Sequence, residues 1–188
     1  MTAANYEQLP ADLPVPEDDG AADHLPGLVL PPLPLVSTSG ETIDLRAAGR
    51  PRAVVYVYPM TGTPGVPLLE GWDQIPGARG CTPETLGFRN LYEELSGLGV
   101  EVFGLSSQDP EDQAEAAARL NLPFPLLSDS GLTLADQLGL PTFEAGDRPR
   151  YKRLTLVLND GRIEHVFYPI FPPDKHAAEV LAWLQAAA

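Results

Sequence analysis

Short apolar runs of two kinds alternate along the chain and predict its secondary structure. Runs rich in β-branched and aromatic residues indicate strands, whereas apolar residues spaced three and four positions apart indicate helices. Strands are expected at residues 52–58, 100–105, 125–129, 153–158 and 162–168. Helices are expected at residues 83–97, 110–120, 132–138 and 173–187. Helix-linked strands followed by a hairpin and a last helix predict a mixed α/β sandwich.

Turn residues organise the segments between these elements. Ser39-Gly40 predicts the turn of an N-terminal hairpin, and Asn159-Asp160-Gly161 predicts the turn between the last two strands. Residues 28–35 are interrupted by prolines, which cannot donate a ladder hydrogen bond, so this segment is expected at a sheet edge. Residues 139–149 are expected to form a loop.

The first 26 residues differ in composition from the rest of the chain. They are rich in Pro, Ala, Asp and Glu and show no apolar periodicity. Residues 1–26 are therefore predicted to be a flexible or merely draped arm, here called the N-terminal arm, without a catalytic role. Residues 27–188 are expected to form one domain, because the chain has 188 residues and 44% hydrophobic residues, enough for a single sizeable core.

Charge and cysteine content narrow the possible partners. A formal net charge of −14 argues against a nucleic-acid surface or an anionic membrane, because both would repel this protein. We find neither a charged and apolar N-terminal leader nor an apolar stretch of membrane-spanning length, so a cytoplasmic location is expected. The single cysteine excludes an internal disulfide. The three histidines show no metal-ligand spacing, and no metal site is predicted.

The single cysteine, Cys81, lies at the predicted start of a helix, where Pro83 suits the first helical position. A free thiol is only ~3 % thiolate at pH 7, and the helix dipole adds at most ~2 kcal/mol of stabilisation. A cation is needed as well, and the candidates are Arg79 and Arg153. Glu84 would oppose a nearby thiolate, so we expect it to be held in an ion pair with Arg79 or Arg89.

The sequence around this cysteine resembles that of a known family. Gly80-Cys81-Thr82-Pro83-Glu84, followed by Phe88-Arg89 and Tyr92-Glu93-Glu94, is similar to the peroxiredoxins, and most of all to the bacterioferritin-comigratory branch. The likeness runs from about Leu33 to the C-terminus. It implies a thioredoxin-like fold with an N-terminal β-hairpin and a central mixed sheet flanked by helices. It also implies a peroxidase that requires neither metal nor organic cofactor.

The resemblance assigns roles to residues of this chain. Cys81 corresponds to the peroxidatic cysteine, and Pro59 corresponds to the proline that shields the thiolate. Arg153 corresponds to the arginine that binds the thiolate and the peroxide, with Arg148 and Arg150 as rivals. A catalytic role for Arg79 is weighed against that of an ordinary loop residue.

The chain departs from the family pattern at two places. The motif is split by an inserted loop, residues 66–80, so that Val66 stands where the cysteine would follow Thr63-Pro64-Gly65 and Ala78 replaces the usual threonine. The hydroxyl that positions the peroxide must then come from Thr63, Thr61 or Thr82, or be absent. The branch's common resolving cysteine is replaced by Leu86. Trp72 is expected to anchor the inserted loop by packing, or to lie at an interface.

These observations favour a one-cysteine, thiol-dependent peroxidase for hydrogen peroxide or organic hydroperoxides. Cys81 would become a sulfenic acid, stabilised in its formation by Arg153 and a threonine, and an external thiol or a thioredoxin- or glutaredoxin-like reductant would recycle it. A monomer or a homodimer is expected. One alternative is a redox sensor or binding module with a reactive Cys81 but no turnover. Another is a structural thioredoxin-like protein, in which alkylating reagents would scarcely touch the cysteine.

Overall fold

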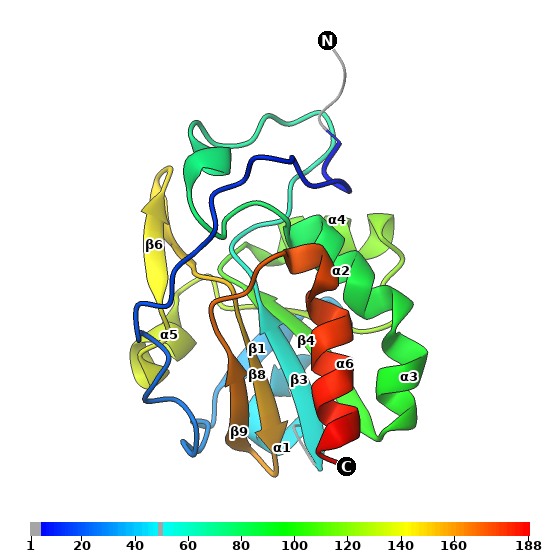
Figure 1. Cartoon of the computed structure of the whole chain (residues 1–188). Coiled ribbons are helices and arrows are strands. Elements are labelled where there is room, and N and C mark those ends of the chain that lie inside the picture. Colours follow the sequence, from blue (N-terminus) through cyan, green and yellow to red (C-terminus); the bar gives the residue numbers. More distant parts are fainter. Residues whose placement is uncertain (1–4, 49–50) are drawn as a thin grey trace.

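Figure 1 shows the computed structural model, which describes residues 5–48 and 51–188. The strands are β1 (Pro34–Ser37), β2 (Thr42–Asp44), β3 (Arg52–Val57), β4 (Val100–Ser106), β5 (Leu126–Ser128), β6 (Thr142–Ala145), β7 (Arg148–Tyr151), β8 (Leu154–Asn159) and β9 (Arg162–Phe167). The α-helices are α1 (Leu45–Ala48), α2 (Cys81–Asn90), α3 (Tyr92–Gly97), α4 (Pro110–Arg119), α5 (Thr133–Leu138) and α6 (His176–Ala186). Two short 3-10 helices are η1 (Trp72–Gln74) and η2 (Pro173–Lys175).

A seven-stranded mixed sheet forms the centre of the molecule (Figure 1). Its strand order is β2-β1-β5-β4-β3-β8-β9, with β3 parallel to β4, β4 parallel to β5, and the other pairs antiparallel. Successive residues of β3 alternate between two hydrophobic clusters, because side chains alternate across a strand. Helices α2, α3, α4 and α6 contribute to the cluster on one face, and α1, α5 and part of the N-terminal arm contribute to the other. The predicted thioredoxin-like arrangement is confirmed.

The helix that carries Cys81 begins two residues earlier than predicted. Gly80 takes the N-cap position with a φ of 111°, a left-handed conformation that suits glycine. The helix therefore starts at Cys81 itself, and Pro83 is its third residue, which is tolerated because first-turn N–H groups lack helical partners. The expected single helix is divided at Leu91, although hydrogen bonds from Leu91 to Gly87 and from Leu95 to Leu91 bridge the division.

One further expectation about strands was wrong, and another was met only in part. Residues 139–149 contain most of the β6–β7 hairpin rather than only a loop, with Gly146 at a φ of 70° in its turn. Phe143 and Ala145 of this hairpin pack against the inserted loop. These contacts stabilise the hairpin, and no local sequence pattern reveals them. The proline-rich segment 28–35 is at an edge only in part. Val29 forms an isolated antiparallel bridge with Arg162 along the outer side of the edge strand β9, whereas Pro34 and Leu35 belong to β1, which lies between β2 and β5. On its β1 side, β5 pairs with Val36 and Ser37, which lie beyond the prolines, so no missing N–H interrupts that ladder.

The beginning of the N-terminal arm lies beside the inserted loop at one end of the molecule, and the rest of the arm runs down the side of the molecule past β6 and α5 (Figure 1). Within the described part of the arm, residues 5–26, Leu25 is fully buried in the core and Tyr6 is only 7% exposed. Trp72 anchors the inserted loop by packing with Ala78 and Phe143, as predicted. The arm and the loop thus form a cover over the end of the sheet from which β3 leads toward Cys81.

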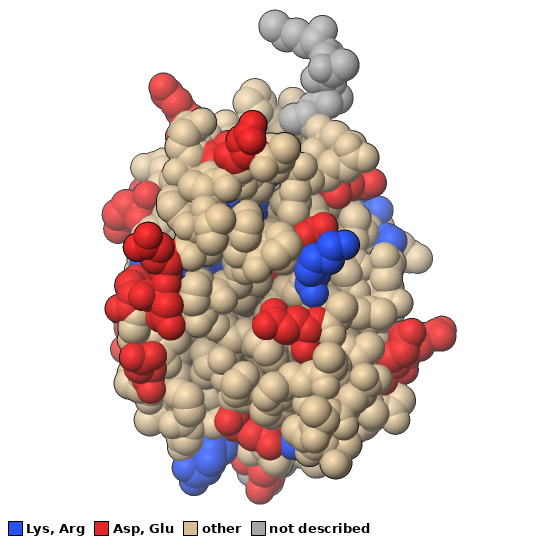
Figure 2. Space-filling model, viewed as in Figure 1, with Lys and Arg blue, Asp and Glu red and all other residues tan. Residues whose placement is uncertain are grey.

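The surface agrees with the acidic composition. Figure 2 shows more acidic than basic side chains on the face that it presents, most densely along its left edge. This face offers no basic patch of the kind that binds nucleic acid. No helix of the described residues has the length and apolar character needed to cross a membrane.

Candidate active site

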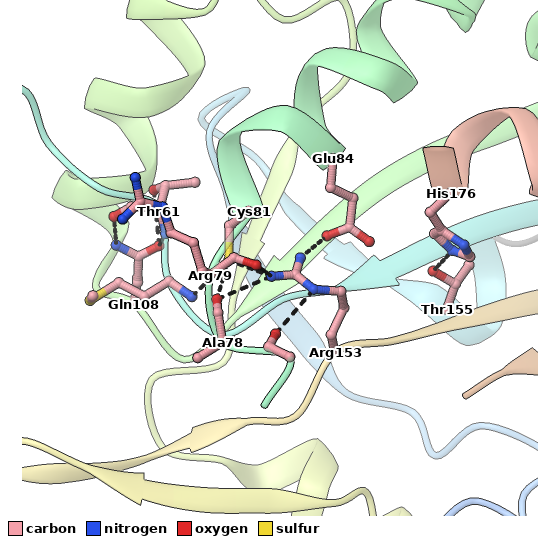
Figure 3. A network of polar contacts seen from close by, with 11 residues as sticks. Thr61, Ala78, Arg79, Cys81, Glu84, Gln108, Arg153, Thr155 and His176 are labelled. Carbon is pink, nitrogen blue, oxygen red and sulfur yellow. Dashed lines mark hydrogen bonds and ion pairs between the residues drawn. The ribbon is translucent and has the colours of Figure 1, made fainter. Parts of the chain in front are cut away.

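Cys81 is the first residue of α2, and its side chain is 2% exposed (Figure 3). The sulfur accepts a hydrogen bond from the Met60 backbone N–H at 3.4 Å and another from Arg153 Nη2 at 3.2 Å. Met60 is the third residue after β3, and Arg153 directly precedes β8. Two neighbouring strands of the sheet therefore position the two donors. The protonated thiol can itself donate to the Ala78 carbonyl oxygen at 3.7 Å, a contact that favours the thiol form. Two donors directed at the sulfur favour its thiolate form.

Gly80 determines how Cys81 is presented. A Cβ atom at this position would overlap the ring of Pro173 and would lie 2.9 Å from Leu9. With a φ of 111°, the residue also has a backbone conformation that other residues rarely adopt. Only glycine allows η2, the N-terminal arm and the start of α2 to meet this closely.

Arg153 connects the segments of the site. It directly precedes β8 and is 3% exposed. Its guanidinium donates to the carbonyl oxygens of Gly77, Ala78 and Arg79 at 3.3, 3.2 and 3.3 Å, to the Cys81 sulfur, and to Glu84. One arginine therefore holds the end of the inserted loop and also pairs with two acidic groups of α2.

The electrostatics of the site follow from one cation facing two acids. Burial raises the pKa of Cys81, and the Arg153 guanidinium opposes that rise. Burial also raises the pKa of Glu84 to about 7, again against the effect of Arg153. Each acid disfavours ionisation of the other, because Glu84 raises the pKa of Cys81. When Glu84 is protonated, the positive charge of Arg153 is left to stabilise the thiolate.

The expected partner of Glu84 was wrong. Glu84 is fully buried and pairs with Arg153, 69 residues away, rather than with Arg79 or Arg89. Arg79 pairs with Asp73 at 2.9 Å, and Arg89 donates to the Leu120 carbonyl oxygen at 2.9 Å. Of the two cations proposed for Cys81, only Arg153 donates to its sulfur among the described contacts.

The rival arginines are placed elsewhere. Arg148 pairs with Asp109 at 3.4 Å, at the start of α4. Burial lowers the pKa of Arg150, and no hydrogen bond in the described part of the chain joins it to Cys81. Of the three arginines considered, Arg153 is therefore the one that contacts the Cys81 sulfur.

The three threonines are not equivalent. Thr82 is 2% exposed beside Cys81, and its hydroxyl has no hydrogen-bond partner among the described residues. The Thr61 hydroxyl donates to the side-chain oxygen of Gln108 at 3.1 Å, so it is already engaged. Thr63 is half-buried and does not line the cavity at Cys81. Thr82 is thus the hydroxyl that the structure leaves free next to the sulfur.

A cavity of about 10 Å³ lies against the sulfur and is called the Cys81 chamber here. Its walls are Tyr6, Met60, Gly62, Leu68, Trp72, Arg79, Gly80, Cys81 and Thr82. The N-terminal arm and the inserted loop therefore close the site. No sequence pattern pointed to Tyr6, because a single aromatic residue in a polar, proline-rich arm shows no periodicity.

Comparison with known proteins identifies the class. The sequence profile of the Redoxin family matches residues 13–181, which is most of the chain. The chain is 32% identical over 184 residues to chloroplastic peroxiredoxin Q of Gentiana triflora, covering 95% of this chain and 77% of the relative. It is 34% identical over 162 residues to chloroplastic peroxiredoxin Q of Populus jackii, covering 85% and 68%.

Solved structures agree with these relatives. The peroxidoxin BcpB of Mycobacterium tuberculosis superposes with a TM-score of 0.70 at 27% identity, covering 87% of this chain and 98% of that one. Peroxiredoxin Q of Xanthomonas campestris superposes with a TM-score of 0.66 at 25% identity, covering 93% and 95%. The protein is a redoxin by fold and sequence. Within that family, the chain belongs to the peroxiredoxins of the Q type.

Proposed function

We propose that this peroxiredoxin is a one-cysteine, thiol-dependent peroxidase. The observation that carries the proposal is the Cys81 sulfur at the start of α2, with Arg153 Nη2 at 3.2 Å and the Met60 N–H at 3.4 Å. A thiolate in this position accepts hydrogen bonds from two donors and borders the cavity that Cys81 helps to line. Hydroperoxides are the substrates that such a nucleophile reduces.

In the first step, the thiolate attacks the terminal oxygen of the hydroperoxide. The S–O bond forms while the O–O bond breaks, and the electron pair of that bond leaves with the other oxygen, which takes up a proton as water or an alcohol. The sulfur is oxidised by two electrons to a sulfenic acid and the peroxide is reduced. Arg153 stabilises negative charge on the reacting atoms, and the Thr82 hydroxyl donates to a peroxide oxygen.

Recycling requires thiols from outside the chain, because Cys81 is the single cysteine. A first thiol condenses with the sulfenic acid to a mixed disulfide and releases water. A second thiol displaces Cys81 as its thiol and leaves with the first as a disulfide. A small thiol, or a thioredoxin- or glutaredoxin-like protein, supplies both electrons.

The test is peroxide consumption by the wild-type protein and by Cys81→Ser. With an added thiol, the wild type should consume many equivalents of peroxide. The variant should consume none while keeping its circular dichroism spectrum, since a hydroxyl is similar in size but remains protonated. Turnover by Cys81→Ser would refute the proposal.

A second candidate function is a redox sensor, and the nearly closed Cys81 chamber of about 10 Å³ favours it. A sensor would be oxidised at Cys81 once and would not turn over. Mass spectrometry after one equivalent of peroxide, followed by a measurement of peroxide consumption with excess thiol, separates the two functions. Oxidation followed by steady consumption is expected for the peroxidase.

A further inference from the structure

We propose that Tyr6 is a specificity-determining residue, whose ring closes the Cys81 chamber and restricts the reaction to hydrogen peroxide in preference to bulky organic hydroperoxides. This inference rests on the proposed peroxidase function and names its substrate class. It assigns a role in substrate selection to the N-terminal arm, for which the sequence predicts no catalytic role.

The contacts of Tyr6 hold its ring in the chamber wall. The ring packs directly on Gly62, where an added Cβ atom would lie 2.9 Å from it, and the Tyr6 hydroxyl donates to the Val66 carbonyl oxygen. The Arg79 guanidinium carbon lies 5.6 Å from the ring centroid. Arg79 also donates to the Asn5 carbonyl oxygen at 3.4 Å. These contacts join the beginning of the arm to the inserted loop.

The Trp72 wall of the chamber is held by contacts that do not involve the N-terminal arm. Trp72 is 2% exposed, its ring centroid lies 5.9 Å from that of Phe143, and it belongs to a small hydrophobic cluster. The arm is secured further along, where Asp19 pairs with Lys152 at 2.9 Å. The beginning of the arm can therefore lift while the rest of the arm and the inserted loop stay in place.

The size of the chamber sets what reaches the sulfur when Tyr6 is in place. About 10 Å³ is close to the minimum that one water molecule occupies. Hydrogen peroxide exceeds water by a single oxygen atom and needs only a small displacement of the walls. A hydroperoxide with an aromatic or branched carbon group needs the ring of Tyr6 to leave, which is unfavourable because the buried ring would become exposed.

Thiol labelling measures this closure without any peroxide. Because Cys81 is the single cysteine, every alkylated thiol reports the chamber. Rates are measured with iodoacetamide as the small reagent and fluorescein maleimide as the bulky one. Their ratio cancels any change in the thiolate fraction, since both reagents attack the same thiolate. The variants are Tyr6→Ala, Tyr6→Phe, and Glu7→Ala as an exposed control on the same arm.

We expect Tyr6→Ala to raise the maleimide rate relative to the iodoacetamide rate by about 10- to 100-fold, as follows from the loss of one buried aromatic ring. Tyr6→Phe, which keeps the ring, and Glu7→Ala should stay near the wild-type ratio. An unchanged ratio in Tyr6→Ala, or an equal acceleration of both reagents, would overturn the inference.

The kinetic test compares kcat/KM for cumene hydroperoxide and for hydrogen peroxide. The wild type should favour hydrogen peroxide, and Tyr6→Ala should raise the relative value for cumene hydroperoxide by about 10-fold or more. A wild type that prefers cumene hydroperoxide would overturn the inference. Failure of the peroxidase proposal looks different, because no variant would then consume either peroxide while the labelling ratio would still respond to Tyr6.

Discussion

Replacing Glu84 by glutamine should make Cys81 more reactive. Glu84 is fully buried and shares the Arg153 guanidinium with the Cys81 sulfur. Its negative charge therefore competes with the thiolate for one cation. Glutamine has nearly the same shape and still accepts a hydrogen bond from Arg153, so the variant removes the charge and keeps the arrangement.

The size of the effect follows from the geometry. Two unit charges separated by roughly 6 Å across one guanidinium, at an effective dielectric constant of about 20, repel each other by about 3 kcal/mol. This repulsion corresponds to about 100-fold in the ratio of thiolate to thiol when Glu84 is ionised. Because the pKa of Glu84 is raised to about 7, the full effect applies above pH 7 and fades below it.

The assay is the pH dependence of Cys81 alkylation by iodoacetamide. At pH 8, Glu84→Gln should react about 10-fold faster than the wild type or more, with its profile moved to lower pH. Glu94→Gln, an exposed change of the same charge on α3, is the matched control and should leave the profile unchanged. A Glu84→Gln profile that stays in place or moves to higher pH would refute the reasoning. Glu84 would then act only by positioning Arg153.

Stability provides a second readout of the same carboxyl. The folded-state pKa of about 7 exceeds the ordinary value of 4.5, so the folded protein binds more protons at Glu84 than the unfolded chain does between these pH values. Stability therefore falls as pH rises through this window, by roughly 3 kcal/mol from this group. Glu84→Gln lacks that loss. Between pH 4.5 and 7, the free energy of unfolding of Glu84→Gln should therefore rise relative to that of the wild type, as urea titrations would measure.

The remaining predictions concern Arg153 and recycling. Arg153→Lys should slow alkylation of Cys81 at neutral pH by about 10-fold or more, because an ammonium cannot donate to Glu84 and to the sulfur in the same fork geometry. Arg148→Ala should not change this rate, and the assignment fails if Arg148→Ala has the larger effect. Without reductant, one equivalent of peroxide should be consumed rapidly, and excess peroxide should then add further oxygens to Cys81, as mass spectrometry would detect. Spontaneous return of the free thiol would contradict the one-cysteine mechanism.

The parts of the fold that were predictable depend on signals that lie within a few residues. The Asn159-Asp160-Gly161 turn fixes the β8–β9 hairpin, and the run of β-branched residues at 52–57 is a strand in almost any context. The β6–β7 hairpin was missed because it depends on contacts between Phe143 and the inserted loop, which no local pattern encodes. Short strands of this kind are decided by tertiary packing.

The candidate active site shows the same difference between features encoded locally and features that depend on tertiary contacts. The start of the Cys81 helix could be located to within two residues from Pro83, which acts locally on the backbone. The ion-pair partner of Glu84 could not be predicted from the sequence, because the nearest arginines have partners of their own and the true partner is 69 residues away. Tyr6 was invisible for a similar reason, since its role exists only where the arm crosses the inserted loop.

The central position of β3 has a consequence for how different parts of the molecule open. Its residues 53–57 are completely shielded between two hydrophobic clusters and bonded to β4 and β8, so their amides should exchange with solvent only through global unfolding. The beginning of the N-terminal arm has few buried contacts and should open on its own, at a much lower free energy. The sulfur thus lies between the Met60 N–H, three residues beyond the end of this protected strand, and the less protected beginning of the arm. Low concentrations of urea should expose the thiol while leaving hydrogen exchange in the sheet unaffected.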